Sequence, residues 1–342
     1  MTEQYAPALP NTNIRAARRQ TGLIAFLLLL TTALSYLLML IEPFWYAFFE
    51  KILMLIMQAL CARPITEAHL AVDSLMQSQL YSSFTGMLSN LISFFLPFYI
   101  YVRCVGKKAD EMCPLTGGQK CGHLISVFAA LQMCAASASV LCESVSGFVY
   151  GPLFDSFPSE ESVFMTAPEL VVSFLSLCVF TPLLEEFVFR GVIFGSLRPF
   201  GFGYAAVASA LLFGLAHGGP SSMAYALASG LIFSAVREIT GSIRQTVILH
   251  ALNNAVSFLF SYVLPFYANP AFSDTLNYLW NIALCVLAVF GLLHLFSRLK
   301  AVRVESQEAS LETPIQAFLS VGTVLYILLF LYTTIALCLY GY

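Results

Sequence analysis

Long apolar runs, separated by short polar segments, dominate this sequence. A helix needs about 20 mostly apolar residues to cross a bilayer. Seven runs approach or exceed that length: Thr21–Ile41, Phe84–Val102, Gly122–Leu141, Pro168–Leu197, Gln245–Leu264, Tyr278–Phe296 and Ile315–Leu339. The pattern therefore predicts an all-α, polytopic bundle of transmembrane helices.

Three further apolar stretches are shorter or less regular. Tyr204–Ala216 and Met223–Val236 meet at residues 217–220, where a His-Gly-Gly-Pro sequence favours a turn. Each half is short for a span, so the two are expected to form a re-entrant or bent pair, which brings the total to about eight or nine membrane helices. The stretch Phe44–Ala62 is apolar but contains one acid and one base, which predicts a separate interfacial or partly buried helix.

The basic residues indicate the orientation. Arg15, Arg18 and Arg19 precede the first span, which lacks a small-residue cleavage site and is read as an uncleaved anchor. If the spans alternate, most later basic residues fall on the same side: Arg103, Lys107, Lys108, Lys120, Arg198, Arg237, Arg244, Arg298, Lys300 and Arg303. The positive-inside rule then predicts an integral protein of the plasma membrane whose N-terminal tail, residues 1–20, is cytosolic.

Composition supports this class and excludes others. Of 342 residues, 59% are hydrophobic and only 10% are charged, against roughly a quarter in an average soluble protein. So few charges cannot cover a soluble globule of this size, and they also exclude a disordered chain. The net charge of −3 lacks the basic excess that a nucleic-acid-binding protein needs. The lipid bilayer is the partner that remains.

Ionisable residues inside an apolar run are costly, which makes Glu185, Glu186 and Arg190 functional candidates. Glu186 and Arg190 are four residues apart, in the favourable order for an ion pair on one helix face. Glu185 points about 100° away from that pair, so it is free to face a cavity. Pro182, just before the acids, is expected to kink the helix. A purely structural salt bridge would explain Glu186 and Arg190 but not Glu185.

Two other apolar runs contribute polar residues, His217 in one and His250 with Asn254 in the other. His250 and Asn254 lie one turn apart on one helix face. A core histidine and ordinary hydrogen bonds between helices would account for these residues singly. Neither explains why three such anomalies fall within seventy residues of one another.

Helical rise predicts whether these residues can meet. If the bent pair has both ends in the cytosol, His217 lies about 21 Å from Gly203, and Glu185 lies about 20 Å from Arg198. His250 and Asn254 would lie about 9 and 15 Å in from the start of their helix. All of them could then line one cavity that is open to the cytosol.

In order and approximate spacing, Glu185-Glu186-x-x-x-Arg190, Phe213-x-x-x-His217 and His250-x-x-x-Asn254 resemble the three motifs of the CPBP intramembrane proteases. That family includes the CAAX prenyl endopeptidases and the bacterial Abi-type proteins. The resemblance covers about residues 165–265. It divides the chain into N-terminal membrane helices (21–160), a catalytic helical core (161–265) and C-terminal membrane helices (266–342).

The resemblance implies hydrolysis of a peptide bond within the membrane, near its cytosolic face. Glu185 would be the general base that activates water, and His217 would help to hold that water. His250 and Asn254 would form the oxyanion site, while Glu186 and Arg190 would position the base and the substrate. The chemistry agrees, since amide hydrolysis needs a base and preorganised donors for the oxyanion.

A metal is an open alternative. Glu185, His217 and His250 would make a two-His, one-Glu zinc set with a position left for water. The HExxH helix of better-defined zinc proteases is absent from the sequence, so a metal-free mechanism is preferred. The implied substrate is a peptide or protein, either lipidated, as in prenylated CAAX tails, or membrane-embedded.

Other functions are weaker interpretations of the same residues. A serine protease site of the rhomboid type lacks its motif, and an aspartyl site lacks intramembrane Asp pairs. Broken helices around polar residues also occur in transporters, but no internal repeat is visible here. A family member that has lost catalysis and acts in bacteriocin immunity or regulation is a further alternative.

Overall fold

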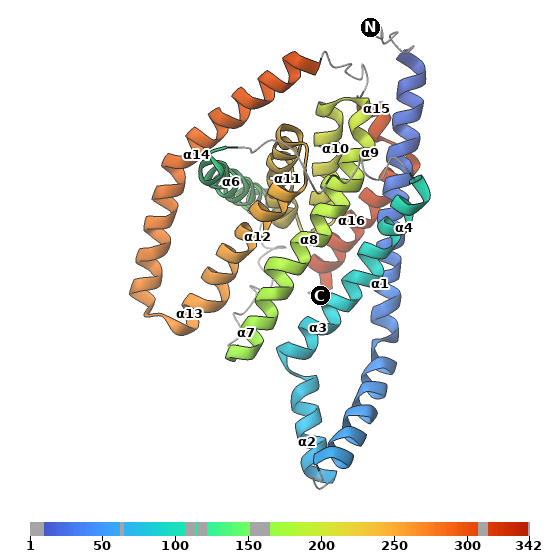
Figure 1. The fold of residues 1–342 in the computed structure, drawn as a ribbon, viewed down its shortest axis with the longest axis vertical. Coiled ribbons are helices and arrows are strands. Elements are labelled where there is room, and N and C mark those ends of the chain that lie inside the picture. The colour runs from blue at the N-terminus through green and yellow to red at the C-terminus, as the bar shows by residue number, and fades with distance from the viewer. Residues whose placement is uncertain are drawn as a thin grey trace.

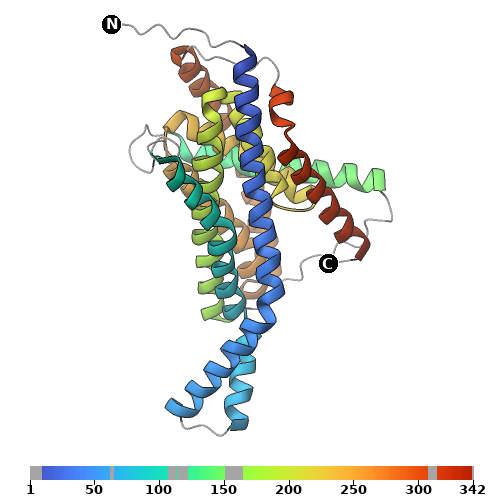
Figure 2. The same ribbon diagram turned by 90° about the vertical axis from the view of Figure 1, so that its right-hand side faces the viewer.

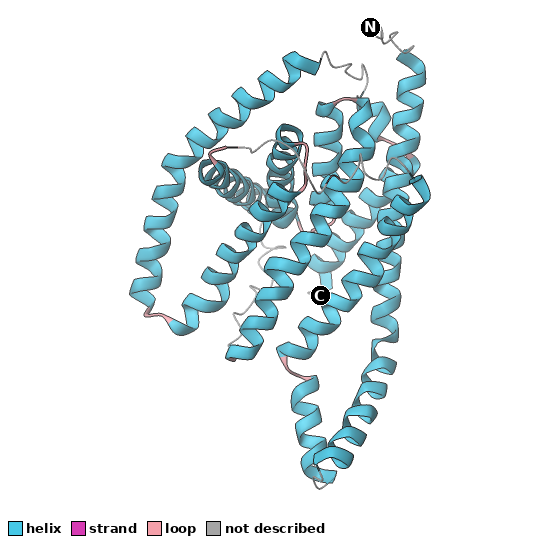
Figure 3. Cartoon of the chain, viewed as in Figure 1, coloured by secondary structure: helices cyan, strands magenta, loops and turns pink. Residues whose placement is uncertain are grey.

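The computed structural model describes residues 10–61, 65–106, 114, 122–150, 165–306 and 314–340, and within these ranges it contains helices and loops but no strand (Figure 3). The longer helices are α1 (Pro10–Cys61), α2 (Ile65–Met76), α3 (Gln79–Ser89), α4 (Leu96–Val105), α6 (Leu124–Tyr150), α10 (Phe202–Leu215), α11 (Pro220–Thr240), α12 (Arg244–Phe258), α14 (Pro270–Ser306) and α16 (Val321–Tyr340). Short α-helices are α7 (Ala167–Phe174), α8 (Thr181–Glu186), α9 (Phe194–Leu197), α13 (Leu264–Tyr267) and α15 (Pro314–Phe318). One 3₁₀ turn, η6 (Arg198–Phe200), and the π-helical segments η1 (Asn90–Phe95), η4 (Leu175–Phe180), η5 (Phe187–Ile193) and η7 (Leu259–Val263) connect them.

The structure confirms the polytopic helical bundle. Six helical segments of the described chain are long and apolar enough to cross a membrane: 14–59, 79–105, 124–145, 167–200, 244–267 and 270–301. Residues 202–215 and 321–336 form shorter apolar helices. Many large hydrophobic side chains on these helices are exposed, as expected where lipid rather than protein covers them.

Helix α1 differs from the prediction. The first span and the stretch Phe44–Ala62 were expected to be separate helices, but they form one continuous helix of 52 residues with Pro43 inside it. A proline within a helix removes one hydrogen bond and bends the helix, which need not end there. Both views show α1 changing direction and its far end pairing with α2 in a hairpin that projects beyond the other helices (Figures 1 and 2). The helix also begins at Pro10, so residues 10–20 of the expected tail are helical, and residues 1–9 lie outside the described chain.

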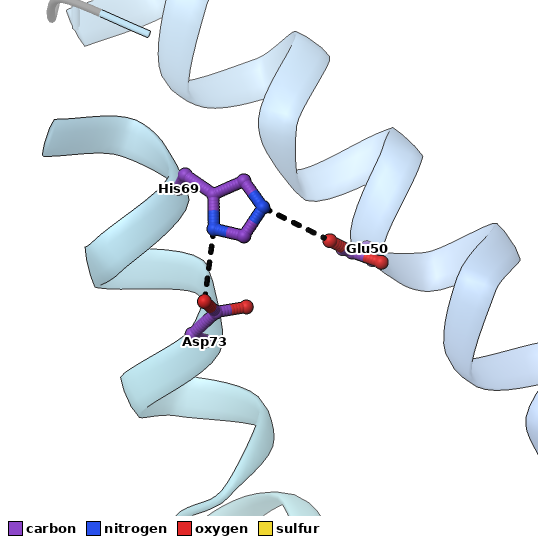
Figure 4. A group of neighbouring side chains, drawn as sticks. All are labelled: Glu50, His69 and Asp73. Atoms are coloured by element: carbon purple, nitrogen blue, oxygen red, sulfur yellow. Dashed lines mark ion pairs between the residues drawn. The ribbon is translucent and has the colours of Figure 1, made fainter. Parts of the chain in front are cut away.

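A polar contact joins the two arms of this hairpin (Figure 4). His69 of α2 lies between two carboxylates: its Nδ1 is 2.8 Å from Asp73 Oδ2, and its Nε2 is 3.7 Å from Glu50 Oε1 on α1. The three side chains are 31–54% exposed. Because exposed ion pairs contribute about 0–1 kcal/mol, this contact adds little to the stability of the hairpin.

The helical run from 167 to 200 carries the first motif and alternates between α and π geometry. It begins at a capping box, in which Thr166 and Glu169 satisfy each other's free backbone groups. The π-helical segments η4 and η5 flank α8, and Pro182 lies inside this continuous run, just after η4, where it cannot donate a backbone hydrogen bond. Ser209 of α10 donates a hydrogen bond of 2.9 Å to the carbonyl of Phe189 in η5. Such π-helical turns often occur at functional sites, because they rotate the side chains that follow.

Helices α10 and α11 form the bent pair that the sequence predicts. The chain reverses at Gly218 and Gly219, whose φ angles of 60° and 58° suit glycine. Helices α6 and α11 are seen nearly end-on in Figure 1, and α6 is seen lengthwise in Figure 2, so α6 runs across the longer helices. The buried core lies where η5, α10 and α11 meet, around Phe189, Phe213 and Phe233.

The close approach of α10 and α11 yields a prediction on stability. A Cβ atom on Gly214 would lie 2.9 Å from the backbone oxygen of Met223, so Gly214→Ala forces the two helices apart. We expect a loss of about 1–3 kcal/mol in the free energy of unfolding, as for other overpacked sites. Gly203→Ala in the same helix is the matched control, since nothing lies within 4 Å of its Cβ position. Thermal unfolding of both variants in detergent tests this, and equal melting temperatures would contradict it.

Candidate active site

A fully buried ion pair stands at the centre of the site. Arg190 Nη1 lies 3.1 Å from Glu186 Oε1, and neither side chain is exposed. The guanidinium carbon of Arg190 lies 4.1 Å from the ring centre of Phe213 and 4.8 Å from that of Phe233. Aromatic faces attract cations, most strongly away from water. The two rings and Glu186 therefore hold Arg190 inside the protein. Arg190 in turn fixes the position of the Glu186 carboxylate.

Glu186 in turn orients His250 of α12. The Nδ1 atom of His250 is 2.9 Å from Glu186 Oε1, and its ring stacks on Phe233 with centroids 5.0 Å apart. An ionised carboxylate only accepts hydrogen bonds, so Nδ1 carries a proton, and Nε2 holds the lone pair of the neutral ring. That Nε2 lies 3.6 Å from Glu185 Oε2. The ion pair thus aims one ring nitrogen at the second glutamate.

His217 is held in a similar way by its own helix end. Its Nδ1 is 2.8 Å from the carbonyl oxygen of Phe213, and the two rings lie edge to face with centroids 4.4 Å apart. A carbonyl also only accepts, so Nδ1 donates and Nε2 again holds the lone pair of the neutral ring. The four-residue spacing of this motif follows directly, because residues i and i+4 are neighbours on a helix.

Glu185 and His217 line one cavity of about 570 Å³. Glu185 is 20% exposed, and within the described residues its buried Oε2 atom has no hydrogen-bond partner. The opposite wall comes from α1, which contributes four hydroxyl groups, and from Asn90 of η1. The lining residues are Leu28, Thr31, Thr32, Ser35, Tyr36, Met39, Asn90, Phe94, Thr181, Leu184, Glu185, Phe189, Ala216, His217 and Tyr326.

Sequence reasoning missed this opposite wall. The polar positions were visible, since Thr31 and Ser35 are one turn apart in an apolar run and Asn90 interrupts another. The structure shows how α1 is held in place. Ser35 donates to Ser93 of η1 at 2.9 Å, and Thr21 is hydrogen-bonded to Tyr204 of α10 at 2.5 Å.

Asn254 lies apart from the cavity-lining residues. Its side-chain nitrogen donates to the carbonyl oxygen of Leu177 in η4 at 2.9 Å. The neighbouring Asn253 is buried, and its side-chain oxygen accepts hydrogen bonds of 2.8 Å from Gln132 and Tyr225. The structure therefore brings together Glu185, Glu186, Arg190 and His250, and places Asn254 as a contact between α12 and η4.

The residues expected to hold zinc are not assembled for it. A three-ligand set needs ligand atoms close enough to reach one ion at about 2.0–2.2 Å. Among the described residues, the one trio of His, Cys, Asp or Glu whose ligand atoms lie within 4.8 Å of one another is Glu50, His69 and Asp73, on α1 and α2. Glu185 and His250 are adjacent, but His217 does not complete a set with them.

Comparisons with known proteins agree with the motifs. Residues 167–256 match the family described as type II CAAX prenyl endopeptidase Rce1-like. The chain is also similar to the membrane-embedded CAAX protease MroQ of Staphylococcus aureus (strain USA300), with 30% identity over 132 residues, which is 36% of this chain. The matched region spans about half of that protein's length, 53%. No solved structure matches the chain at a significant level. Residues 167–256 are therefore similar to membrane-embedded proteases of the CAAX type, the group to which the three motifs point.

Proposed function

We propose that this chain is an intramembrane endopeptidase in which Glu185 activates a water molecule. The observation that carries the proposal is that Glu185 and His217 line one cavity, while the buried Glu186–Arg190 pair fixes His250 beside Glu185. A carboxylate with an unsatisfied oxygen at a partly enclosed cavity is placed to accept a proton. The relationship to CAAX proteases supports the same reaction class.

The reaction is hydrolysis of an amide in two steps. Water, oriented by the lone pair of His217 Nε2, attacks the carbonyl carbon as Glu185 takes its proton. Glu185 then returns that proton to the departing amine nitrogen as the C–N bond breaks. His250 stabilises the oxyanion in its imidazolium form, since Nε2 donates only when protonated. Asn254 assists if it exchanges its bond to Leu177 for one to the oxyanion. No metal takes part in this mechanism.

The surroundings of the reaction are part of the proposal. We place the N-terminus in the cytosol and the protein in the plasma membrane, because basic residues gather on the corresponding side of the spans. The substrate is a peptide or protein, either lipidated, as in prenylated CAAX tails, or membrane-embedded.

Cleavage by the purified protein tests the proposal. The full-length chain in lipid nanodiscs is incubated with a mixture of reporter peptides, prenylated and unmodified, and products are identified by mass spectrometry. We expect cleavage by the native chain and none by Glu185→Ala. Equal cleavage by both proteins would reject the protease mechanism. Binding without turnover by either protein would favour a non-catalytic, immunity or regulatory role.

A further inference from the structure

A second cavity continues from the first along α1. It has a volume of about 460 Å³ and lies between α1 and α3. Ser35 and Met39 line both cavities, so the two adjoin along α1. Together they extend from Glu185 to Trp45 and Phe49, in the part of α1 that follows Pro43. We refer to the second cavity as the α1–α3 groove.

The α1–α3 groove combines aromatic rings with one carboxylate. Trp45 and Phe49 of α1 line it, with ring centroids 6.3 Å apart, and Tyr81 lines it from α3. Glu42 also lines the groove and lies three residues before Trp45, so both side chains share one helix face. No described residue forms a salt bridge or hydrogen bond with the exposed Glu42 side chain in this structure.

This combination suits a cation. Aromatic faces attract ammonium and guanidinium groups within about 6 Å of the ring centre, and tryptophan does so best. A carboxylate beside such a ring adds a charge-assisted hydrogen bond. A purely apolar groove would accept any hydrophobic segment, but the carboxylate of Glu42 favours a segment that carries a positive charge. The groove extends past Ile41, where the first predicted span ends, to Glu42, Trp45 and Phe49, a level at which a cationic group remains partly solvated.

We propose that Glu42, Trp45 and Tyr81 form a subsite for a cationic side chain of the substrate peptide, a lysine or an arginine. The inference rests on the proposed protease function, because it takes the segment in the groove to be continuous with the segment at Glu185. The occupant is an extended peptide: hydroxyl groups of α1 face its scissile region, and the groove holds its apolar and cationic residues.

Geometry predicts where the cationic residue lies. Glu42 and Thr32, which lines the first cavity together with Glu185, are ten residues apart, or about 15 Å along the helix. An extended peptide advances about 3.3 Å per residue. The lysine or arginine should therefore lie about five residues from the scissile bond, on the side that points toward the α1–α2 hairpin.

Binding tests the subsite independently of cleavage. The chain has two tryptophans, so Trp280→Phe leaves Trp45 as a fluorescent reporter inside the groove. Glu185→Gln is added to prevent turnover. The full chain is placed in phosphatidylglycerol nanodiscs, which carry no cationic headgroup. The probes are ten-residue peptides of leucine, alanine and serine with one lysine, or with uncharged norleucine at the same position.

We expect the lysine peptides to bind about tenfold tighter than the norleucine peptides and to change Trp45 emission. Glu42→Gln should remove that difference. Glu67→Gln, the same change at an exposed position of α2, should preserve it. Equal affinities for both peptides, or a lysine preference that survives Glu42→Gln, would overturn the subsite. So would a Trp45 response to phosphatidylcholine with none to peptide, which would indicate a site for a lipid headgroup.

Cleavage products then separate the two proposals. In the native chain, lysine should raise kcat/KM when it lies about five residues from the cut, and Glu42→Gln should abolish that increase. Cleavage that depends on Glu185 but ignores lysine at every position would reject the subsite and leave the protease function intact. Cleavage that is equal in the Glu185 variant would reject the protease function, whereas the binding result on Glu42 would stand.

Discussion

Replacing Glu185 by glutamine is expected to lower kcat for peptide cleavage by about 10²- to 10⁴-fold, the range that a positioned general base contributes. The amide keeps the shape of the side chain but cannot take a proton from water. Glu185 lines the cavity, and within the described residues its Oε2 atom has no hydrogen-bond partner to lose. We therefore expect the free energy of unfolding to change by less than about 0.5 kcal/mol. Initial rates and thermal unfolding of the same preparation measure both quantities.

Chelation separates this mechanism from a zinc-dependent one, which would also lose activity in Glu185→Gln. If Glu185 acts as a base without metal, exhaustive treatment with a chelator leaves the native rate unchanged. The separation of His217 from an assembled ligand set supports that result. Loss of activity on chelation, with recovery on adding zinc, would contradict it and make Glu185, His217 and His250 ligands. A native rate in Glu185→Gln would exclude both mechanisms.

Local rules were sufficient for one half of the site. The spacing of Glu186 and Arg190 predicted an ion pair on one face, and the structure contains it. The same rule predicted that Glu185 points elsewhere, and it lines the cavity. The turn between α10 and α11 followed from Gly218 and Gly219, because glycine adopts the positive φ angles found there without strain. Each of these features depends on residues within one helix or one turn.

The other half depends on contacts between distant segments. Nothing in the spacing of Thr31 and Ser35 indicates that α1 faces Glu185, about 150 residues later in the chain. The acid and base in Phe44–Ala62 predicted a separate helix, but the structure continues α1 through them, with Pro43 inside the helix rather than at its end. On α12, helical periodicity placed His250 and Asn254 on one face, but periodicity does not show which residue a neighbouring helix covers. The structure shows that packing against Gln132 and Tyr225 buries Asn253 instead.

The second large effect is expected at the buried ion pair. Arg190→Leu leaves the carboxylate of Glu186 buried without its cation, and Glu186→Leu leaves the guanidinium of Arg190 buried without its anion. Removing one partner of a buried pair costs about 3–5 kcal/mol. The double variant Glu186→Leu, Arg190→Leu buries no orphaned charge at either position. We expect its loss of stability to be clearly smaller than the sum of the two single losses, by more than about 2 kcal/mol.

A second pair in the same fold provides the comparison. Arg198 and Glu238 are joined by two hydrogen bonds of 2.6 and 2.7 Å, but the arginine side chain is 31% exposed. Water can solvate the Arg198 charge once its partner is removed, so Glu238→Gln should lower the free energy of unfolding by only about 1 kcal/mol. Reversible unfolding in mixed micelles measures all four variants. Additive losses at Glu186 and Arg190, or single losses no larger than that of Glu238→Gln, would contradict the argument. A stable double variant that binds the lysine peptides but does not cleave would show that the pair serves to hold His250 beside Glu185, since only Glu186 contacts its Nδ1 among the described residues.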